Sequence, residues 1–473
     1  MEQTDEYSES SANIACLFEP ESVAVIGSLR ESWFGGYVVV KHLQKYGFSG
    51  KIYPINPKCD TVLGVKAYPT IGEVPGSIDL AIIITSYRAF PRIIEECAEK
   101  KVRAGIIVSD GFAEKDEEGA KLQKEIADIA KRVSMRLIGP NTVGLVNTDN
   151  GLMTNPYLLE YDNIYPGSIA LCGQTGLIGA QALPLEDMHY GISKICAVGN
   201  KCDVDEADIL EYLKNDINTK VIAMHLEDVK DGRRFIEKAK ETVVKKPVLV
   251  LKAGRTKEST DALASHTGSL AGEDRLYDAA MKQAGIIRVN NHVELLEFSR
   301  MFAGKTSLTS GNRVAIVTYT GGFGVMGVDA AVKSGLTLAD YTSETKERLR
   351  KIFPSLSKNP TDLGPALPMI DNFEPAYSEV LEVIANDKNV DCIAIVTFIG
   401  LGMGFLQIFT DLLKKTSKPM ALWVYSQKLA IKSEFVGQLG KAGFPVYSRW
   451  EDAFGALGAI YKYSTIKARL SNR

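Results

Sequence analysis

Short apolar runs rich in valine and isoleucine recur along this 473-residue chain, and stretches of helical periodicity separate them. Ser22–Gly27, Val221–Leu226 and Arg313–Thr318 are clear examples. Such runs are typical of strands in parallel sheets, because crossover helices cover both faces of the sheet and leave the strands without a polar side. The pattern predicts an α/β protein made of doubly wound parallel sheets.

The chain is too long for a single hydrophobic core, and its predicted strands fall into three groups. Two segments without periodicity, 147–165 and 307–312, lie between the groups, and we interpret them as linkers. We therefore expect a Rossmann-like domain over residues 1–147, followed by two flavodoxin-like doubly wound domains over residues 165–306 and 311–473.

The second and third groups open in a similar way. Ser168–Gly176 and Arg313–Gly322 each predict a strand, a turn of glycine and threonine, and the start of a helix with small residues. An internal duplication would explain this similarity. Chance similarity between two ordinary α/β openings is the alternative.

Charge and cysteine usage argue against several classes of protein. The 55 basic and 58 acidic side chains leave a net charge of −3, which gives no electrostatic basis for binding nucleic acid or an anionic membrane. No apolar run reaches the roughly 18 residues that span a bilayer, and the acidic N-terminus has no signal core. The seven cysteines lack CxxC or zinc spacing, so we expect reduced thiols, no metal site and a cytoplasmic enzyme.

A single histidine, His266, lies in the run Ala264–Gly272, where all the other residues but one leucine are small. Backbone N–H groups and hydroxyls in such a run can surround a transferable phosphoryl group. We interpret His266 as a nucleophile that is phosphorylated during turnover. A surface-loop histidine without a role is the alternative.

The sequence SHTGSLAG at Ser265–Gly272, preceded by LKAGRT, resembles the phosphohistidine segment of the NDP-forming acyl-CoA synthetases. Specifically, it resembles the alpha subunit of archaeal-type ADP-forming acetyl-CoA synthetase, a relative of succinyl-CoA synthetase. The resemblance extends from about Leu17 to about Tyr463 through several ordered motifs.

The resemblance implies a reaction. Acyl-CoA and phosphate give acyl phosphate and free CoA, His266 takes the phosphoryl group, and ADP receives it to form ATP. No ATP-grasp segment is recognised in the sequence, so ATP or ADP and Mg²⁺ are expected mainly on a separate ATP-grasp beta subunit of a hetero-oligomer. The carboxylic acid is the remaining substrate.

Loops after the strands of the first group are the predicted coenzyme A site, because ligands of doubly wound sheets bind at the carboxyl ends of the strands. The first loop lacks GxGxxG, and the resembled family has Gly-Ala-Ser-Arg where this chain has Gly27-Ser28-Leu29-Arg30. Lys58 lies in YPINPK, which matches the family's YPVNPK; a rigid turn with a solvated lysine is the alternative. The residues predicted to bind coenzyme A are Gly27, Ser28, Arg30, Lys58, Thr85, Ser86, Ser109 and Gly111.

Two further turns are predicted to hold phosphate and the thioester. Asn141 lies in a Gly-Pro-Asn loop that can present an amide to a carbonyl oxygen, and Thr142 follows where the family usually has cysteine. Gln174, Thr175 and Gly176 are expected to open a helix whose N-terminus favours phosphate. A small-residue turn needed only for packing is the alternative.

Glu227 follows the strand Val221–Leu226, within a segment that resembles the family's LE-x-VKDGRRF. The resemblance implies a hydrogen bond from the catalytic histidine to this carboxylate, which would fix the tautomer of His266. A solvated loop acid is the alternative. His225 is retained only as a weaker candidate near the same site.

The third group departs most from the family, since Tyr319 and Phe323 interrupt its TNAGGPG motif. We expect these rings to change the size and polarity of a pocket and hence the acyl group. Two other functions remain open from the sequence. One is a non-catalytic CoA-binding regulatory protein, and the other is a nicotinamide-dependent oxidoreductase, which the missing GxGxxG disfavours.

Overall fold

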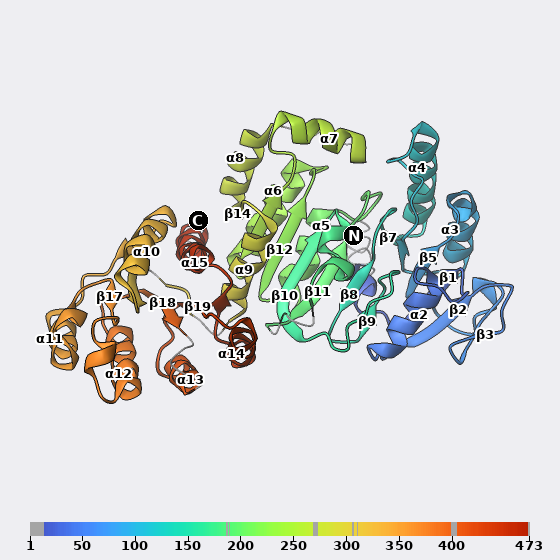
Figure 1. Ribbon diagram of the computed structural model, residues 1–473. Helices are drawn as coiled ribbons and strands as arrows, with labels where there is room; N and C mark the ends of the chain where they lie inside the picture. Colours follow the sequence, from blue (N-terminus) through green and yellow to red (C-terminus); the bar gives the residue numbers. More distant parts are fainter. Residues whose placement is uncertain are drawn as a thin grey trace. The chain divides into compact units, whose positions relative to one another are not determined.

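The computed structural model describes residues 14–185, 188, 190–267, 273–304, 307–309, 311–398 and 404–471 (Figure 1). The chain forms two compact units, Met1–Arg288 and Val289–Arg473, and each is described by itself. The first unit holds two large sheets and a small hairpin of β3 (Thr61–Val62) and β4 (Val65–Lys66). The second unit is built on the third large sheet.

The first sheet consists of five parallel strands in the order β2-β1-β5-β6-β7. An isolated parallel bridge between Ile55 and Tyr68 extends it beyond β2. The strands are β1 (Ser22–Gly27), β2 (Lys51–Ile55), β5 (Leu80–Ile84), β6 (Ala104–Ile107) and β7 (Arg136–Ile138). The helices are α2 (Gly36–Lys45), α3 (Phe90–Glu99) and α4 (Glu117–Arg132).

The second sheet has the order β14-β13-β12-β10-β11-β8-β9. Its strands are β8 (Leu145–Asn147), β9 (Leu152–Met153), β10 (Pro166–Gly173), β11 (Ile192–Ala197), β12 (Val221–Leu226), β13 (Val248–Lys252) and β14 (Ile287–Val289). Its helices are α5 (Glu206–Asn215), α6 (Gly232–Lys245), α7 (Lys257–Thr267) and α8 (Asp274–Ala284). Without the antiparallel strands β8 and β9, the order β11-β10-β12-β13-β14 is that of flavodoxin.

The interpretation of 147–165 as a linker is wrong for its first part. Strand β9 lies within this segment and pairs with β8, which itself pairs with β11 at the edge of the second sheet. The side chains of Leu152 and Met153 are buried, but two residues are too few to show an alternating pattern in the sequence. The segment is therefore part of the sheet before it crosses to β10.

The third sheet repeats the flavodoxin order as β16-β15-β18-β19-β20, with β17 beside β15. Its strands are β15 (Arg313–Thr318), β16 (Thr337–Leu338), β17 (Thr361–Asp362), β18 (Cys392–Phe398), β19 (Met420–Tyr425) and β20 (Val446–Tyr447). The helices of this unit are α9 (His292–Ala303), α10 (Gly321–Lys333), α11 (Ser343–Ile352), α12 (Phe373–Ala385), α13 (Phe405–Lys415), α14 (Leu429–Lys441) and α15 (Trp450–Ser471).

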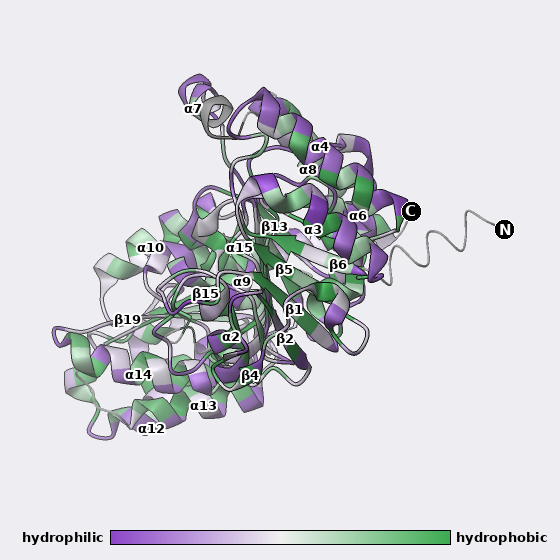
Figure 2. Ribbon diagram, turned by 90° about the vertical axis from the view of Figure 1, so that its right-hand side faces the viewer, coloured by the Kyte–Doolittle hydropathy of each residue, from purple (hydrophilic) through white to green (hydrophobic). Residues whose placement is uncertain are grey.

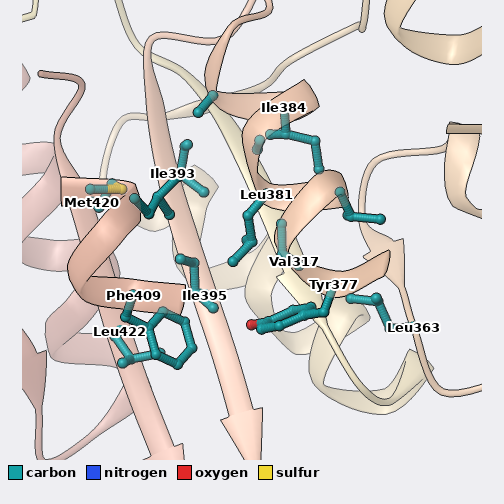
Figure 3. Packing of buried hydrophobic residues seen from close by; sticks show 14 of the residues in the cluster. Val317, Leu363, Tyr377, Leu381, Ile384, Ile393, Ile395, Phe409, Met420 and Leu422 are labelled. Carbon is teal, nitrogen blue, oxygen red and sulfur yellow. The ribbon is translucent and has the colours of Figure 1, made fainter. Parts of the chain in front are cut away.

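Apolar clusters cover both faces of the third sheet. On one face Val317 and Ile395 pack with Tyr377 of α12 and Phe409 of α13 (Figure 3). The other face packs against α15, where Phe454 belongs to the cluster. Figure 2 shows a comparable pattern in the first unit, where largely hydrophobic strands such as β5 lie beneath helices with hydrophilic outer residues. The predicted class of doubly wound α/β sheets is confirmed.

The three-domain division and the duplication stay predictions. When β17 is left out, all three large sheets share the order of second, first, third, fourth and fifth parallel strand, so the order alone does not distinguish duplication from repeated use of a common fold. No helix among the described residues is long and apolar enough to cross a membrane.

Candidate functional site

A cavity of 870 Å³ lies in the first unit, between the carboxyl ends of the first sheet and the turn after β10. The edge of a parallel sheet is where ligands of doubly wound folds bind. The residues around the cavity are Ser28, Phe34, Gly35, Ile84, Thr85, Ser86, Tyr87, Val108, Ser109, Asp110, Asn141, Thr142, Val143, Pro156, Tyr157, Gln174, Thr175, Gly176, Gln181 and Ala197.

Most of the predicted site residues from both sheets meet at this cavity. Those that line it are Ser28, Thr85, Ser86, Ser109, Asn141, Gln174, Thr175 and Gly176. The other predicted coenzyme A residues, Gly27, Arg30, Lys58 and Gly111, are not among its lining residues. Arg30 and Lys58 have exposed side chains. The cavity thus joins the two groups of loops that sequence analysis assigned to coenzyme A and to phosphate.

Gly27 does not line the cavity, but its backbone lets the loop after β1 pass close to Ile84, which does. Its φ of 143° lies in the region that favours glycine, and a Cβ added there would lie 1.9 Å from the carbonyl oxygen of Ile84. The Asn56 Nδ2 donates to the Gly27 oxygen over 2.7 Å, and the Asn56 Oδ1 accepts from the Lys58 N–H over 2.8 Å. The amide of Asn56 therefore fixes the loop that carries Lys58 against the loop after β1.

The loops after β5 and β6 are joined by Ser109. Its hydroxyl donates to the Thr85 oxygen over 2.6 Å and accepts from the Thr85 N–H over 3.1 Å. One acceptor position of the Ser109 oxygen stays available to a ligand. In the same loop the Gly111 N–H donates to Glu114 Oε1 over 2.6 Å, and Asn200 Nδ2 donates to Glu114 Oε2. Gly111, which was predicted to bind coenzyme A, therefore contributes to the conformation of this loop and does not line the cavity.

The backbone of the Asn141 loop is held so that the Asn141 side-chain amide is exposed to the cavity. Asn141 adopts φ of 59°, its N–H donates to the Ser109 oxygen over 2.9 Å, and its side chain is exposed at the cavity. The Thr142 hydroxyl donates to the Ala197 oxygen and accepts from the Gly144 N–H over 3.0 Å. Thr142 is thus engaged with the protein, whereas Asn141 can reach a ligand.

The turn after β10 differs from the expected helix. It forms two short 3₁₀ turns, Gly176–Ile178 and Ala180–Ala182. Pro184 lacks an N–H and restricts the residue before it, which favours the end of the second turn at Ala182. The side chain of Gln181 folds back, and its Nε2 donates to the Gly176 oxygen over 2.9 Å. The predicted helix is therefore wrong, and a phosphate at this turn would meet the N–H groups of a short 3₁₀ turn instead of a helix N-terminus.

Glu227 lies at the end of β12 and is buried. Its N–H donates to the Gln174 Oε1 over 2.7 Å, so the turn after β10 holds the backbone of Glu227. Lys252 lies at the end of β13. Its Nζ donates to the backbone carbonyl oxygen of Glu227 over 2.7 Å and also to that of Ala253. This Nζ lies 4.4 Å from the ring centroid of Tyr277 in α8. Burial lowers the pKa of Lys252.

His266 lies in the last turn of α7 by its backbone. Its side chain, and residues 268–272, are outside the described part of the chain. The predicted contact between His266 and Glu227 therefore stays a prediction. The neighbouring His225 is buried, and desolvation and the Lys252 charge lower its pKa to about 4, so it is neutral at pH 7.

Ion pairs connect β7 of the first sheet to the loop and helix that follow β11 of the second sheet. Arg136 of β7 contacts Asp203 over 2.9 Å and Asp208 over 3.2 Å. Burial acts to raise the pKa of Asp208, but Arg234 and Arg136 hold that pKa below its usual value. Next to them Lys201, with only 1% of its side chain exposed, contacts Glu206 over 3.1 Å and Asp228 over 2.5 Å.

Several residues that close the cavity were not predicted from the sequence. Phe34, Pro156, Tyr157 and Gln181 line it, and the Phe34 and Tyr157 ring centroids lie 4.9 Å apart. Tyr157 lies in the segment that was interpreted as a linker, so its sequence context gave no indication of a site. In the sequence, Phe34 directly before the glycine pair Gly35-Gly36 was the feature that could have indicated an apolar contact to a ligand.

The unit of the third sheet places Tyr319 and Phe323 beside other aromatic rings. Tyr319 is buried in the apolar core of its unit, with its ring centroid 5.4 Å from that of Tyr377. Phe323 packs against Trp423, 5.1 Å between centroids. Both rings thus pack against aromatic neighbours, and the expectation that they change a pocket and the acyl group stays a prediction. Among the described residues, no group of three or more His, Cys, Asp or Glu side chains could hold a metal ion.

Comparisons with known proteins agree with this geometry. Residues 21–148 match the family described as CoA binding domain, and residues 166–302 match the succinyl-CoA ligase like flavodoxin domain. The chain is 38% identical to the alpha subunit of ADP-forming acetate–CoA ligase II of Pyrococcus furiosus, across 94% of this chain and 96% of that subunit. It is 36% identical to the alpha subunit of ligase I of the same organism, across 97% and 99%.

Longer relatives and a solved structure extend the match. The chain is 35% identical to ADP-forming acetate–CoA ligase II of Archaeoglobus fulgidus, across 95% of this chain and 66% of that longer protein. The solved dinucleotide forming acetyl-coenzyme A synthetase 1 of Ca. Korarchaeum cryptofilum, in complex with phosphate and ADP, has a TM-score of 0.87 and 28% identity. It covers 97% of this chain and is itself covered to 98%.

The fold and the site thus define a CoA ligase of the succinyl-CoA synthetase type. The chain belongs to the ADP-forming acetate–CoA ligase family, and over nearly its whole length it corresponds to the alpha subunit of those enzymes. The family membership predicted from the sequence is confirmed.

Proposed function

We propose that this chain is the alpha subunit of an ADP-forming acyl-CoA synthetase. It would interconvert acyl-CoA, ADP and phosphate with a carboxylic acid, CoA and ATP. The observation that carries the proposal is a cavity at which the loops of a CoA-binding domain meet Asn141 and the Gln174–Gly176 turn. The backbone of Glu227 is hydrogen-bonded to the Gln174 side chain of that turn.

The first step would take place in this cavity. An oxygen of inorganic phosphate attacks the thioester carbonyl carbon, the C–S bond breaks, and acyl phosphate and the CoA thiolate are formed. The Asn141 amide is placed to donate to the carbonyl oxygen as negative charge develops on it. The second N–H of the Gln174 side-chain amide, whose first donates to Asp228 Oδ1, and the backbone N–H groups of Thr175 and Gly176 would hold phosphate oxygens.

In the second step a nitrogen of His266 attacks the phosphorus of acyl phosphate, and the carboxylic acid leaves as carboxylate. Glu227 would hold the proton on the other ring nitrogen, which makes the attacking nitrogen more basic. The phosphoryl group then passes to ADP. We place the nucleotide and Mg²⁺ on an ATP-grasp beta subunit, with which this chain would form a hetero-oligomer.

The other functions considered from the sequence are less well supported. The relatives named above are ligases by name, which favours catalysis over a regulatory or oxidoreductase function. All seven cysteines are free thiols, which supports a reducing cytoplasmic location.

Labelling of the purified chain tests the proposal. With labelled phosphate and acyl-CoA, we expect acid-labile, base-stable label on the wild-type chain and none on His266→Ala. His292→Ala, in the second unit, is the matched control and should label normally. Label that persists in His266→Ala would contradict the assignment.

A further inference from the structure

An apolar wall closes the cavity next to the predicted phosphate turn. Phe34 and Tyr157 form it, together with Pro156 and Val143. The two rings lie 4.9 Å apart between centroids, and their backbones form an antiparallel bridge. The Gly35 N–H donates to the Pro156 oxygen over 2.9 Å. Two loops distant in sequence are thus joined into one fixed surface.

A chain of contacts places this wall beside the reacting groups. The Tyr157 N–H donates to Asn155 Oδ1 over 2.9 Å, and Asn155 Nδ2 donates to Gln181 Oε1 over 2.7 Å. Gln181 Nε2 in turn donates to the Gly176 oxygen. A Cβ added to Gly176 would lie 3.6 Å from Val143 Cγ1, so the turn and the wall are in near contact.

Three polar side chains next to the wall, Asn155, Gln181 and Thr142, are engaged with the protein. The amide oxygens of Asn155 and Gln181 each accept a hydrogen bond, and each amide nitrogen donates one. The Thr142 hydroxyl donates to Ala197 and accepts from Gly144. A polar substituent on an acyl chain would lose water here and gain little in exchange, whereas a methylene would gain from burial.

We propose that Phe34 and Tyr157 are specificity-determining residues whose rings bind the acyl chain. The substrate class is then apolar carboxylic acids of four or more carbons, and acetate is a poor substrate. This inference rests on the proposed function, because that function places the thioester at Asn141. Each additional buried methylene is expected to strengthen acyl-CoA binding by about fourfold.

Calorimetry on the whole chain without phosphate measures this preference, since no acyl transfer can occur. The probes are free CoA, acetyl-CoA, butyryl-CoA, 4-hydroxybutyryl-CoA and 3-methylbutanoyl-CoA. We expect 3-methylbutanoyl-CoA to bind at least tenfold more tightly than acetyl-CoA. Butyryl-CoA should bind about tenfold more tightly than its hydroxylated analogue, because the hydroxyl loses water against the two apolar ring faces.

Variants assign the preference to the wall. Tyr157→Ala and Phe34→Leu should bring the affinities for acetyl-CoA and 3-methylbutanoyl-CoA within about threefold of each other, with free CoA unchanged. Tyr157→Phe keeps the ring and should keep the preference, and Leu158→Ala, next in sequence with an exposed side chain, is the control. The thermal unfolding midpoint identifies any variant that fails to fold, and Phe34→Leu then stands in for Tyr157→Ala.

The outcomes separate this inference from the function beneath it. If free CoA binds but the wild-type chain does not distinguish the acyl groups, the acyl-pocket assignment is overturned and the proposed function stands. If Tyr157→Ala weakens free CoA and every acyl-CoA equally, the wall serves the common CoA moiety and the assignment is again overturned. If free CoA does not bind at all, the proposed function itself fails.

Discussion

The side-chain oxygen of Gln174 accepts hydrogen bonds from the backbone N–H groups of Glu227, over 2.7 Å, and Asp228, over 3.1 Å. Its Nε2 donates to Asp228 Oδ1 over 2.6 Å. One amide thus fixes the turn after β10 to the turn after β12. The proposed phosphate turn and the proposed orienting carboxylate therefore keep a constant separation.

Gln174→Leu should disturb both turns. Three hydrogen bonds are lost and two backbone N–H groups lose their partner, which predicts a decrease of about 2 kcal/mol in the free energy of unfolding. We expect His266 phosphorylation to slow by about 10- to 100-fold. Single-turnover labelling and urea unfolding measure the two effects. Gln44→Leu, at an exposed helix position, is the control, and a normal labelling rate in Gln174→Leu would contradict the positioning role.

Glu227→Gln should slow phosphorylation of His266 by about 10- to 100-fold, because it keeps a hydrogen-bond acceptor but removes the charge that stabilises the proton on the ring. CoA affinity should be unchanged, since the first sheet supplies that site. Both quantities are measured on the same preparation, with the exposed Glu237→Gln as control. A parallel loss of CoA affinity would mean that Glu227 serves the structure only.

Lys252→Met tests how the segment carrying His266 is held. The Lys252 ammonium donates to the backbone oxygens of Glu227 and Ala253 and lies over the Tyr277 ring. Glu227 precedes the segment that carries His266, Ala253 lies at its start, and Tyr277 follows it. Methionine fills the space without donating, so we expect slower labelling, unchanged CoA binding and a loss of about 1 to 3 kcal/mol in stability. Equal labelling rates in Lys252→Met and wild type would exclude the role.

His42 predicts a pH dependence of stability. The ring is buried, with Nδ1 3.0 Å from the Asn155 oxygen and Nε2 accepting from the Leu159 N–H over 3.2 Å. Burial lowers its pKa to about 4, whereas an unfolded histidine titrates near 6.5. The unfolded state therefore binds more protons between these values, and stability falls as the pH drops from about 6.5 to about 4, by about 3 kcal/mol in total.

Urea unfolding of wild type and His42→Gln at pH 7.5, 5.5 and 4.5 measures this dependence. The stability difference between the two proteins should be largest at pH 7.5 and should shrink towards pH 4.5. His225, whose pKa is also lowered to about 4, has the same sign and stays in both proteins, so it cancels. A difference that is constant with pH would contradict the prediction.

Lys58→Ala should weaken CoA binding by about 1 to 2 kcal/mol if the lysine contacts a phosphate of CoA. Its side chain is exposed outside the cavity and its loop is fixed by Asn56, so a long ligand could reach it. Calorimetry with Lys66→Ala as control is the measurement. Unchanged affinity would assign Lys58 to a solvated turn.

The parallel strands were predictable because burial on both faces produces unbroken apolar runs. Strands β1, β12 and β15 have the bounds that the sequence indicated. Strands β8 and β9 were not predictable, since each has only two or three residues in the sheet. Among the predicted polar site residues that follow a strand, Asn141 and Gln174 lie at the cavity, whereas Arg30 and Lys58 do not line it. Tyr157 was missed because its place depends on a long-range bridge to Phe34.

Thr142 occupies the cavity where a cysteine was expected from the resembled family, and none of the described residues that line the cavity is a cysteine. Thiol chemistry therefore has no protein target among the described side chains that line the cavity. When CoA is released in the cavity, its sulfur would meet no protein thiol with which to form a mixed disulfide. Oxidants and alkylating agents that inactivate enzymes through a reactive cysteine should leave this centre intact. Threonine in place of cysteine thus predicts that oxidation of a thiol in the cavity lining is not a route to inactivation.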